Sequence, residues 1–75
     1  MHISYHATLA LARRGLSVAN VDWCVAGNNY FVQPNNNRHY TRDYDGGRST
    51  VHVLTSNDGG TLVTAWIRGR LDPGV

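Results

Sequence analysis

The first part of the chain carries apolar side chains at helical spacing. Leu9 and Ala12 stand three residues apart and Leu16 four residues further on, which predicts a helix over 5–14 with one apolar face. Gly15 suits the left-handed conformation that ends a helix. Ser17 is suited to cap a second helix over 17–26. We expect its buried stripe to consist of Val18, Val21, Cys24 and Val25.

After Gly27 the period of the pattern changes from about 3.6 to 2. Four strands are predicted, and the segments between them are rich in Asn, Asp, Gly and Pro: 30–33, 38–44, 49–55 and 61–67. Two helices followed by four strands indicate a single α+β domain over 1–75. We expect both helices to pack on one face of a four-stranded antiparallel sheet. The end of the chain, 68–75, reads as a frayed tail.

Alternation along each strand predicts which side chains share a face of the sheet. We expect an apolar set to lie under the helices: Val51, Val53, Val63, Ala65 and Ile67. The other face then receives His52, Leu54, Leu62, Thr64 and Trp66. Strand 38–44 offers two sets for that face, namely Arg38, Tyr40, Arg42 and Tyr44, or His39, Thr41 and Asp43. The cationic and aromatic character of the first set favours placing it on the open face, as a binding surface for single-stranded nucleic acid, although an ordinary solvated sheet face has a similar composition.

The charge composition limits the functions that the chain can have. All seven basic residues are arginine, lysine and glutamate are absent, and the net charge is +2. Arginine pairs with phosphate and stacks on bases, which suits RNA, but a GC-rich genome produces the same bias. The net charge is too small for long, non-specific binding along a nucleic-acid backbone. With one cysteine, Cys24, no internal disulfide forms, and no segment has the length of a membrane span or the pattern of a signal peptide.

His6 is the first candidate for chemistry. It falls in the first turn of the predicted helix, where the positive end of the helix dipole favours a neutral ring that can accept a proton as a general base. The alternative is that its ring packs against the sheet. His2 stands four residues before His6, the spacing of two zinc ligands on one helix face, but no carboxylate or cysteine neighbours them. A chain without lysine cannot form a P-loop, and no GxSxG sequence occurs.

Several short motifs resemble those of a family of small bacterial domains with an amino-terminal HA…RG[IL]S segment. They are His6-Ala7, Arg14-Gly15-Leu16-Ser17, Val21, Arg38-x-Tyr40, Val51-x-Val53, Asp58-Gly59 and Val63-Thr64-Ala65-Trp66. The order of elements is similar to that of the barnase–EndoU–colicin–RelE superfamily of ribonuclease toxins. The resemblance covers nearly the whole chain. One departure is Ala10, where the family usually has arginine or another polar residue.

The resemblance implies a metal-independent endoribonuclease that needs no cofactor and cleaves RNA, tRNA being one candidate, by attack of the 2′-hydroxyl on the adjacent phosphate. It implies His6 as base or acid, Arg38 as a phosphate clamp, and Tyr40 and Thr64 as donors to the phosphate or as a proton donor. Face geometry adds His52 to the catalytic candidates. The expected RNA-binding residues are Arg14, Arg42 and Trp66.

The resemblance also implies partners and a place of action. The ribonucleases that it points to are toxins of toxin–antitoxin pairs or carboxy-terminal toxin domains of contact-dependent inhibition and related secretion systems. Such a toxin acts in the bacterial cytoplasm, in some cases after delivery from a secreted or cell-surface effector. We expect a small acidic immunity or antitoxin protein to cover the arginine-rich face. The alternative function is a RelE-like module that binds RNA or protein without cleaving.

Overall fold

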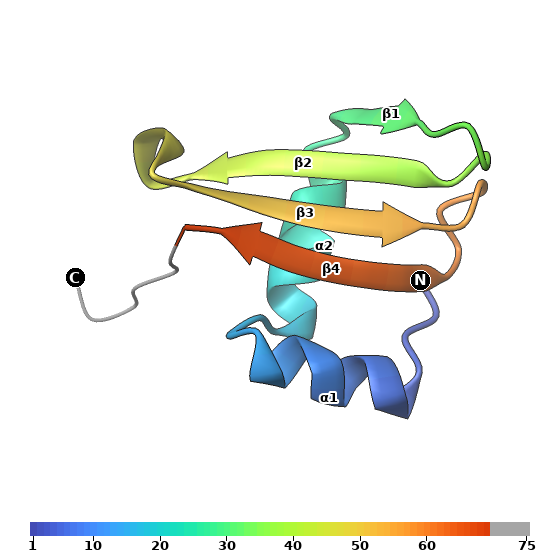
Figure 1. The fold of residues 1–75 in the computed structure, drawn as a ribbon, viewed down its shortest axis with the longest axis horizontal. Helices are drawn as coiled ribbons and strands as arrows, with labels where there is room; N and C mark the ends of the chain where they lie inside the picture. Colours follow the sequence, from blue (N-terminus) through green and yellow to red (C-terminus); the bar gives the residue numbers. More distant parts are fainter. Residues whose placement is uncertain (70–75) are drawn as a thin grey trace.

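Two helices precede a four-stranded antiparallel sheet, as predicted (Figure 1). The computed structural model describes residues 1–69. Arg68, expected in the tail, belongs to the last strand, and residues 70–75 of the predicted tail lie outside the described residues. The elements are α1 (Tyr5–Arg13), α2 (Val18–Ala26), β1 (Tyr30–Val32), β2 (Arg38–Tyr44), the 3-10 turn η1 (Asp45–Gly47), β3 (Ser49–Thr55) and β4 (Leu62–Arg68). The strands lie in chain order, β1-β2-β3-β4, so that each pairs with the next.

Both helices begin at a serine whose side chain accepts a backbone hydrogen bond. The Ser4 hydroxyl accepts from the amide of Ala7 at 3.1 Å. Ser17 forms a capping box with Asn20, since its hydroxyl accepts from the Asn20 amide while the Asn20 side chain accepts from the Ser17 amide. These bonds satisfy amide groups that have no partner inside the helix, and they fix where α1 and α2 begin.

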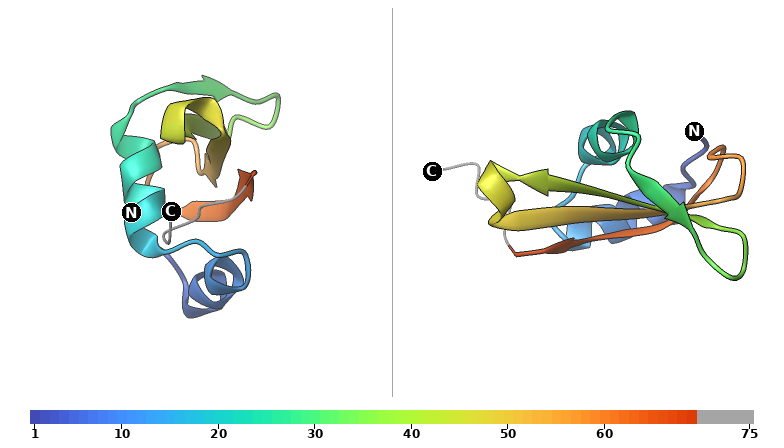
Figure 2. Two further views of the ribbon diagram at one scale, coloured as in Figure 1. Left: turned by 90° about the vertical axis from the view of Figure 1, so that its left-hand side faces the viewer. Right: turned by 90° about the horizontal axis from the view of Figure 1, so that it is seen from above.

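The two helices take different positions against the sheet. Helix α2 crosses the face of β2 and β3, and α1 runs beside β4 (Figures 1 and 2). The core between them consists of Leu11, Leu16, Val21, Cys24, Tyr40, Val51, Val53, Leu62 and Ala65. Burial raises the pKa of the Cys24 thiol to about 11, so it remains protonated at neutral pH. No described element lies over the opposite face of the sheet, which we call the open face.

The buried stripes of the helices differ from the predicted ones. Leu9 is 42% exposed, whereas Leu11 is buried. Because α1 lies beside one strand instead of lying over the sheet, only a narrow stripe of Ala7 and Leu11 reaches the core. In α2, Val21 and Cys24 are buried as expected, but Val18 is 41% exposed.

A register shift between Leu54 and Thr55 changes the face assignment at the start of β4. Thr55 pairs with Leu62 and Leu54 pairs with Thr64, so Val63 is an extra residue in β4. The alternation therefore slips by one residue. Leu62 is 6% exposed and lies in the core, and Val63 is 52% exposed, the reverse of the prediction.

The prediction of which β2 side chains lie on the open face is wrong. Tyr40 pairs with Val53 and Arg42 pairs with Val51, so Arg38, Tyr40, Arg42 and Tyr44 share the face that the helices cover. Tyr40 is only 3% exposed. A tyrosine or arginine can bury its apolar part while its polar end finds a partner, so polar character did not identify the outer set.

The open face therefore carries the other set of β2 residues. Its members come from all four strands: Phe31, His39, Thr41, Asp43, Thr50, His52, Leu54, Thr64, Trp66 and Arg68. No helix among residues 1–69 is long and apolar enough to span a membrane.

Candidate nucleic-acid interface

A groove of about 260 Å³ lies between α1 and β4. Its α1 side includes His6 and Arg14, and its β4 side consists of residues 62–65, including Thr64. We call it the helix–strand groove. It brings together three of the residues singled out in the sequence, although Arg14 and Thr64 are 50 positions apart in the chain.

Arg14 joins the two walls of this groove. Its Nη1 donates to the Thr64 hydroxyl at 2.9 Å and to the Ala65 carbonyl at 2.7 Å. Both bonds use Nη1, so Nε and Nη2 make no hydrogen bond to any other residue of the described chain. Arginine carries five N–H donors in a fixed fork, and the remaining ones are available to an anion in the groove. Arg14 is exposed, so such an anion can reach it.

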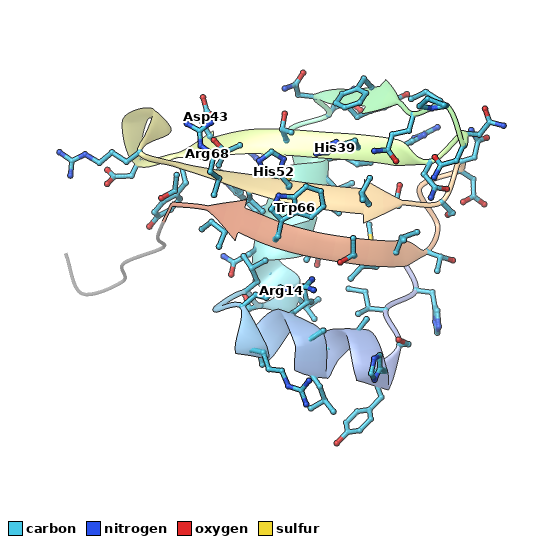
Figure 3. All side chains as sticks on the ribbon, in the orientation of Figure 1. Arg14, His39, Asp43, His52, Trp66 and Arg68 are labelled. Carbon is cyan, nitrogen blue, oxygen red and sulfur yellow. The ribbon has the colours of Figure 1, made fainter. Side chains whose placement is uncertain are left out.

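Four rings, one from each strand, gather on the open face, and His39 contacts both His52 and Trp66. Phe31 of β1 lies 4.8 Å from His39 of β2, and His39 lies 5.2 Å from His52 of β3. His52 stacks on Trp66 of β4 at 4.9 Å, with only 4° between the ring planes. We call these four residues the ring row. Figure 3 shows His39, His52 and Trp66 gathered near the middle of the sheet.

The two imidazoles of the ring row are joined by a hydrogen bond. His39 Nε2 and His52 Nδ1 lie 2.9 Å apart, so one ring donates and the other accepts, depending on the tautomer. The pKa of His52 is lowered, first because the ring is partly removed from water and then because His39 and the positive charge of Arg68 oppose a further proton. His52 is therefore neutral at pH 7 and can accept a proton.

The ring row adjoins the helix–strand groove along β4. Thr64, which Arg14 binds, lies on the open face two residues before Trp66, and side chains at this spacing share a face. Beyond the row, Arg68 and Asp43 each lie beside Thr50, whose hydroxyl donates to the Asp43 carboxylate at 3.0 Å. The groove and the open face thus form one surface that runs from Arg14 to Arg68 (Figure 3).

The structure separates the predicted site residues into two groups. His6, Arg14 and Thr64 line the groove, and His52 and Trp66 belong to the ring row. By contrast, Arg38, Tyr40 and Arg42 lie on the covered face, so the expectation that they belong to the open surface is wrong.

The three residues on the covered face make structural contacts. Arg38 donates to the Tyr40 hydroxyl at 3.1 Å and lies 4.7 Å from the ring centre of Tyr30. Arg42 lies 4.3 Å from the ring centre of Trp23 and donates to the Trp23 carbonyl at 2.8 Å. These contacts hold β1, β2 and α2 together, and we leave the three residues out of the proposed site.

Sequence reasoning did not select Phe31 or His39. His39 belongs to the set of strand 38–44 that the sequence prediction leaves off the open face, and Phe31 lies in the predicted strand 30–33 with no role assigned to it. The available signal was the hairpin: pairing Tyr44 with Ser49 across the short turn places Tyr40 opposite Val53 and turns His39 outward.

Comparisons of the chain with protein-family models, with curated proteins and with solved structures find no match. Among residues 1–69, no group of three or more His, Cys, Asp or Glu side chains is arranged to hold a metal ion. His2, the residue considered as a zinc ligand with His6, forms an isolated bridge to Thr61 through its backbone.

Proposed function

We propose that the chain is a metal-independent endoribonuclease whose active site is the helix–strand groove. The observation that carries the proposal is that His6, Arg14 and Thr64 line one groove, His6 from the first turn of α1 and Arg14 from its carboxyl end, where it binds Thr64. These side chains supply a proton acceptor, a cation and a hydroxyl donor, which are the groups that phosphodiester transesterification needs. The resemblance of the HA…RGLS and Val-Thr-Ala-Trp segments to ribonuclease toxins supports the same reaction.

In the proposed reaction, His6 accepts the proton of a ribose 2′-hydroxyl, and the 2′-oxygen attacks the adjacent phosphorus. The bond from phosphorus to the 5′-oxygen breaks, and the imidazolium of His6 returns the proton to that oxygen. The products are a 2′,3′-cyclic phosphate and a 5′-hydroxyl. The free N–H groups of Arg14 and the hydroxyl of Thr64 stabilise the negative charge that builds up on the phosphoryl oxygens.

We further propose that the protein acts as a toxin in the bacterial cytoplasm and is neutralised by an acidic immunity or antitoxin protein. An exposed cationic side chain stands at each end of the surface, Arg14 at the groove and Arg68 beyond the ring row. An acidic partner that covers both would also exclude RNA.

The test is incubation of the purified, partner-free protein with total bacterial RNA in EDTA, read on a denaturing gel with end-group analysis. We expect discrete fragments with cyclic-phosphate ends. His6→Ala should reduce the rate by about 100-fold or more, the usual contribution of a general base. His2→Ala is the matched control, because His2 contacts Gly60 and Leu62 through its backbone, and it should cleave as the wild type does.

Two results contradict the proposal in different ways. RNA that stays intact with a folded protein argues against a ribonuclease and favours the non-catalytic RNA- or protein-binding module. Cleavage that survives His6→Ala keeps the activity but removes the groove as its site, and His52→Gln then tests the ring row.

A further inference from the structure

We propose that the ring row of Phe31, His39, His52 and Trp66 binds the unpaired bases of the RNA strand whose phosphate enters the helix–strand groove, so that single-stranded RNA is the substrate class. The inference depends on the proposed function only for which RNA strand is bound. The binding surface itself does not depend on it. The ring row is a separate feature from the groove, since none of its four rings lines the groove.

The first support is that the rings are gathered in one place. Phe31 lies 4.8 Å from His39, and the rings of His39, His52 and Trp66 lie 4.9–5.3 Å from one another. Exposed aromatic side chains on a four-stranded sheet hold unstacked bases in other RNA-binding folds.

The second support is that the rings remain accessible. Phe31 is 56% exposed at the start of the row, and His39, His52 and Trp66 are partly exposed. Large exposed rings cost free energy in water, and stacking with a base removes that cost without requiring a particular base.

The third support is the arrangement of charge. A bound strand needs cations for its backbone beside the rings that contact its bases. The open surface has Arg14, which binds Thr64 next to one end of the row, and Arg68, which lies beyond the row and acts electrostatically on His52. Asp43, the acidic residue of the open face, is engaged by the Thr50 hydroxyl. An A-form duplex presents its phosphates and 2′-hydroxyls outward and keeps its bases paired, so it cannot use the ring row.

The experiment measures binding without cleavage. The probe is a fluorescent eight-nucleotide oligouridylate with 2′-O-methyl groups, which cannot undergo transesterification, and the readout is fluorescence anisotropy. Phe31→Ala and Trp66→Ala should each weaken binding by about 5- to 100-fold, the range for loss of one base–aromatic stack. Val32→Ala is the matched control for Phe31→Ala, because Val32 is 54% exposed on the same strand but on the other face. Trp66→Phe keeps a ring and should retain most of the affinity.

The outcomes separate this inference from the proposed function. Unchanged affinity in both alanine variants, equal affinity for a duplex of the same length, or no binding by the wild type would each overturn it. If the wild type binds the methylated strand but does not cleave unmodified RNA, the ring row stands and the ribonuclease proposal falls. If the wild type cleaves RNA and both alanine variants bind the methylated strand as tightly as it does, the ribonuclease proposal stands and the inference about the ring row falls.

Discussion

His52 couples the open face to pH. Partial burial, His39 and Arg68 lower its pKa below the usual 6.5, whereas in the unfolded chain the ring titrates near that value. Between the two pKa values the unfolded state binds more protons, so the folded state loses stability as the pH falls from about 6.5. The charged group that acts on this ring is Arg68 from β4, and the ring that acts on it from β2 is His39; Asp43 of β2 lies on the same face opposite Thr50.

We therefore expect the melting temperature to rise between pH 5 and pH 7 and then to level off, as measured by circular dichroism in buffers of constant ionic strength. His52→Gln removes the titrating ring while keeping a polar side chain, and its melting temperature should depend less on pH over that range. Equal pH dependence in both proteins would show that other groups determine it.

The β-bulge in β4 is the element that decides which side chain reaches the core at the strand's start. Leu62→Ala should lower the free energy of unfolding by about 2–4 kcal/mol, because it empties a buried site. Val63→Ala, at the neighbouring and exposed position, should change it by less than about 0.5 kcal/mol. The comparison is made by urea denaturation of the two variants and the wild type. A larger loss for Val63→Ala would mean that the strand has the regular alternation first expected.

The elements themselves were largely predictable, because local signals determine them. Ser17 and Gly15 mark the helix boundaries, and the switch to period two marks the strands. The faces were less predictable. For β2 the turn length was decisive: with Tyr44 opposite Ser49, antiparallel pairing places Tyr40 opposite Val53, which contradicts a choice made by polarity. For β4 the bulge left no comparable mark in the sequence, since Leu62 and Val63 are equally apolar.

At the scale of the whole molecule, the proposed site forms because α1 lies beside the sheet. Arg14 ends α1 and reaches across to Thr64, so the carboxyl end of a helix and an edge strand share one groove. Each residue was a candidate in the sequence, but local patterns do not say on which side of a sheet a helix will pack. The ring row needs the register of all four strands, and each strand contributes only one ring to it.

The distribution of arginine over the molecule gives a last prediction. Arg38 and Arg42 lie over aromatic rings on the covered face, and Arg48 lies 3.9 Å from Asp45 in the β2–β3 turn. Arg14 lines the groove, and Arg68 lies close enough to His52 of the ring row to affect its pKa. Each phosphate contact on a single strand contributes about −0.7 to the slope of log binding constant against log salt concentration, so two contacts give about −1.4.

We expect this slope for the methylated oligouridylate in anisotropy titrations from 50 to 300 mM KCl, about −0.7 for Arg14→Gln, and no change for Arg48→Gln. A slope of about −3 or steeper would mean that arginines of the covered face also contact the strand, and that RNA wraps around the sheet. A shallow slope, together with affinity that depends on Phe31 and Trp66, would mean that stacking provides most of the binding free energy. In that case a net charge of +2 is sufficient for RNA binding, because base stacking replaces most of the electrostatic attraction.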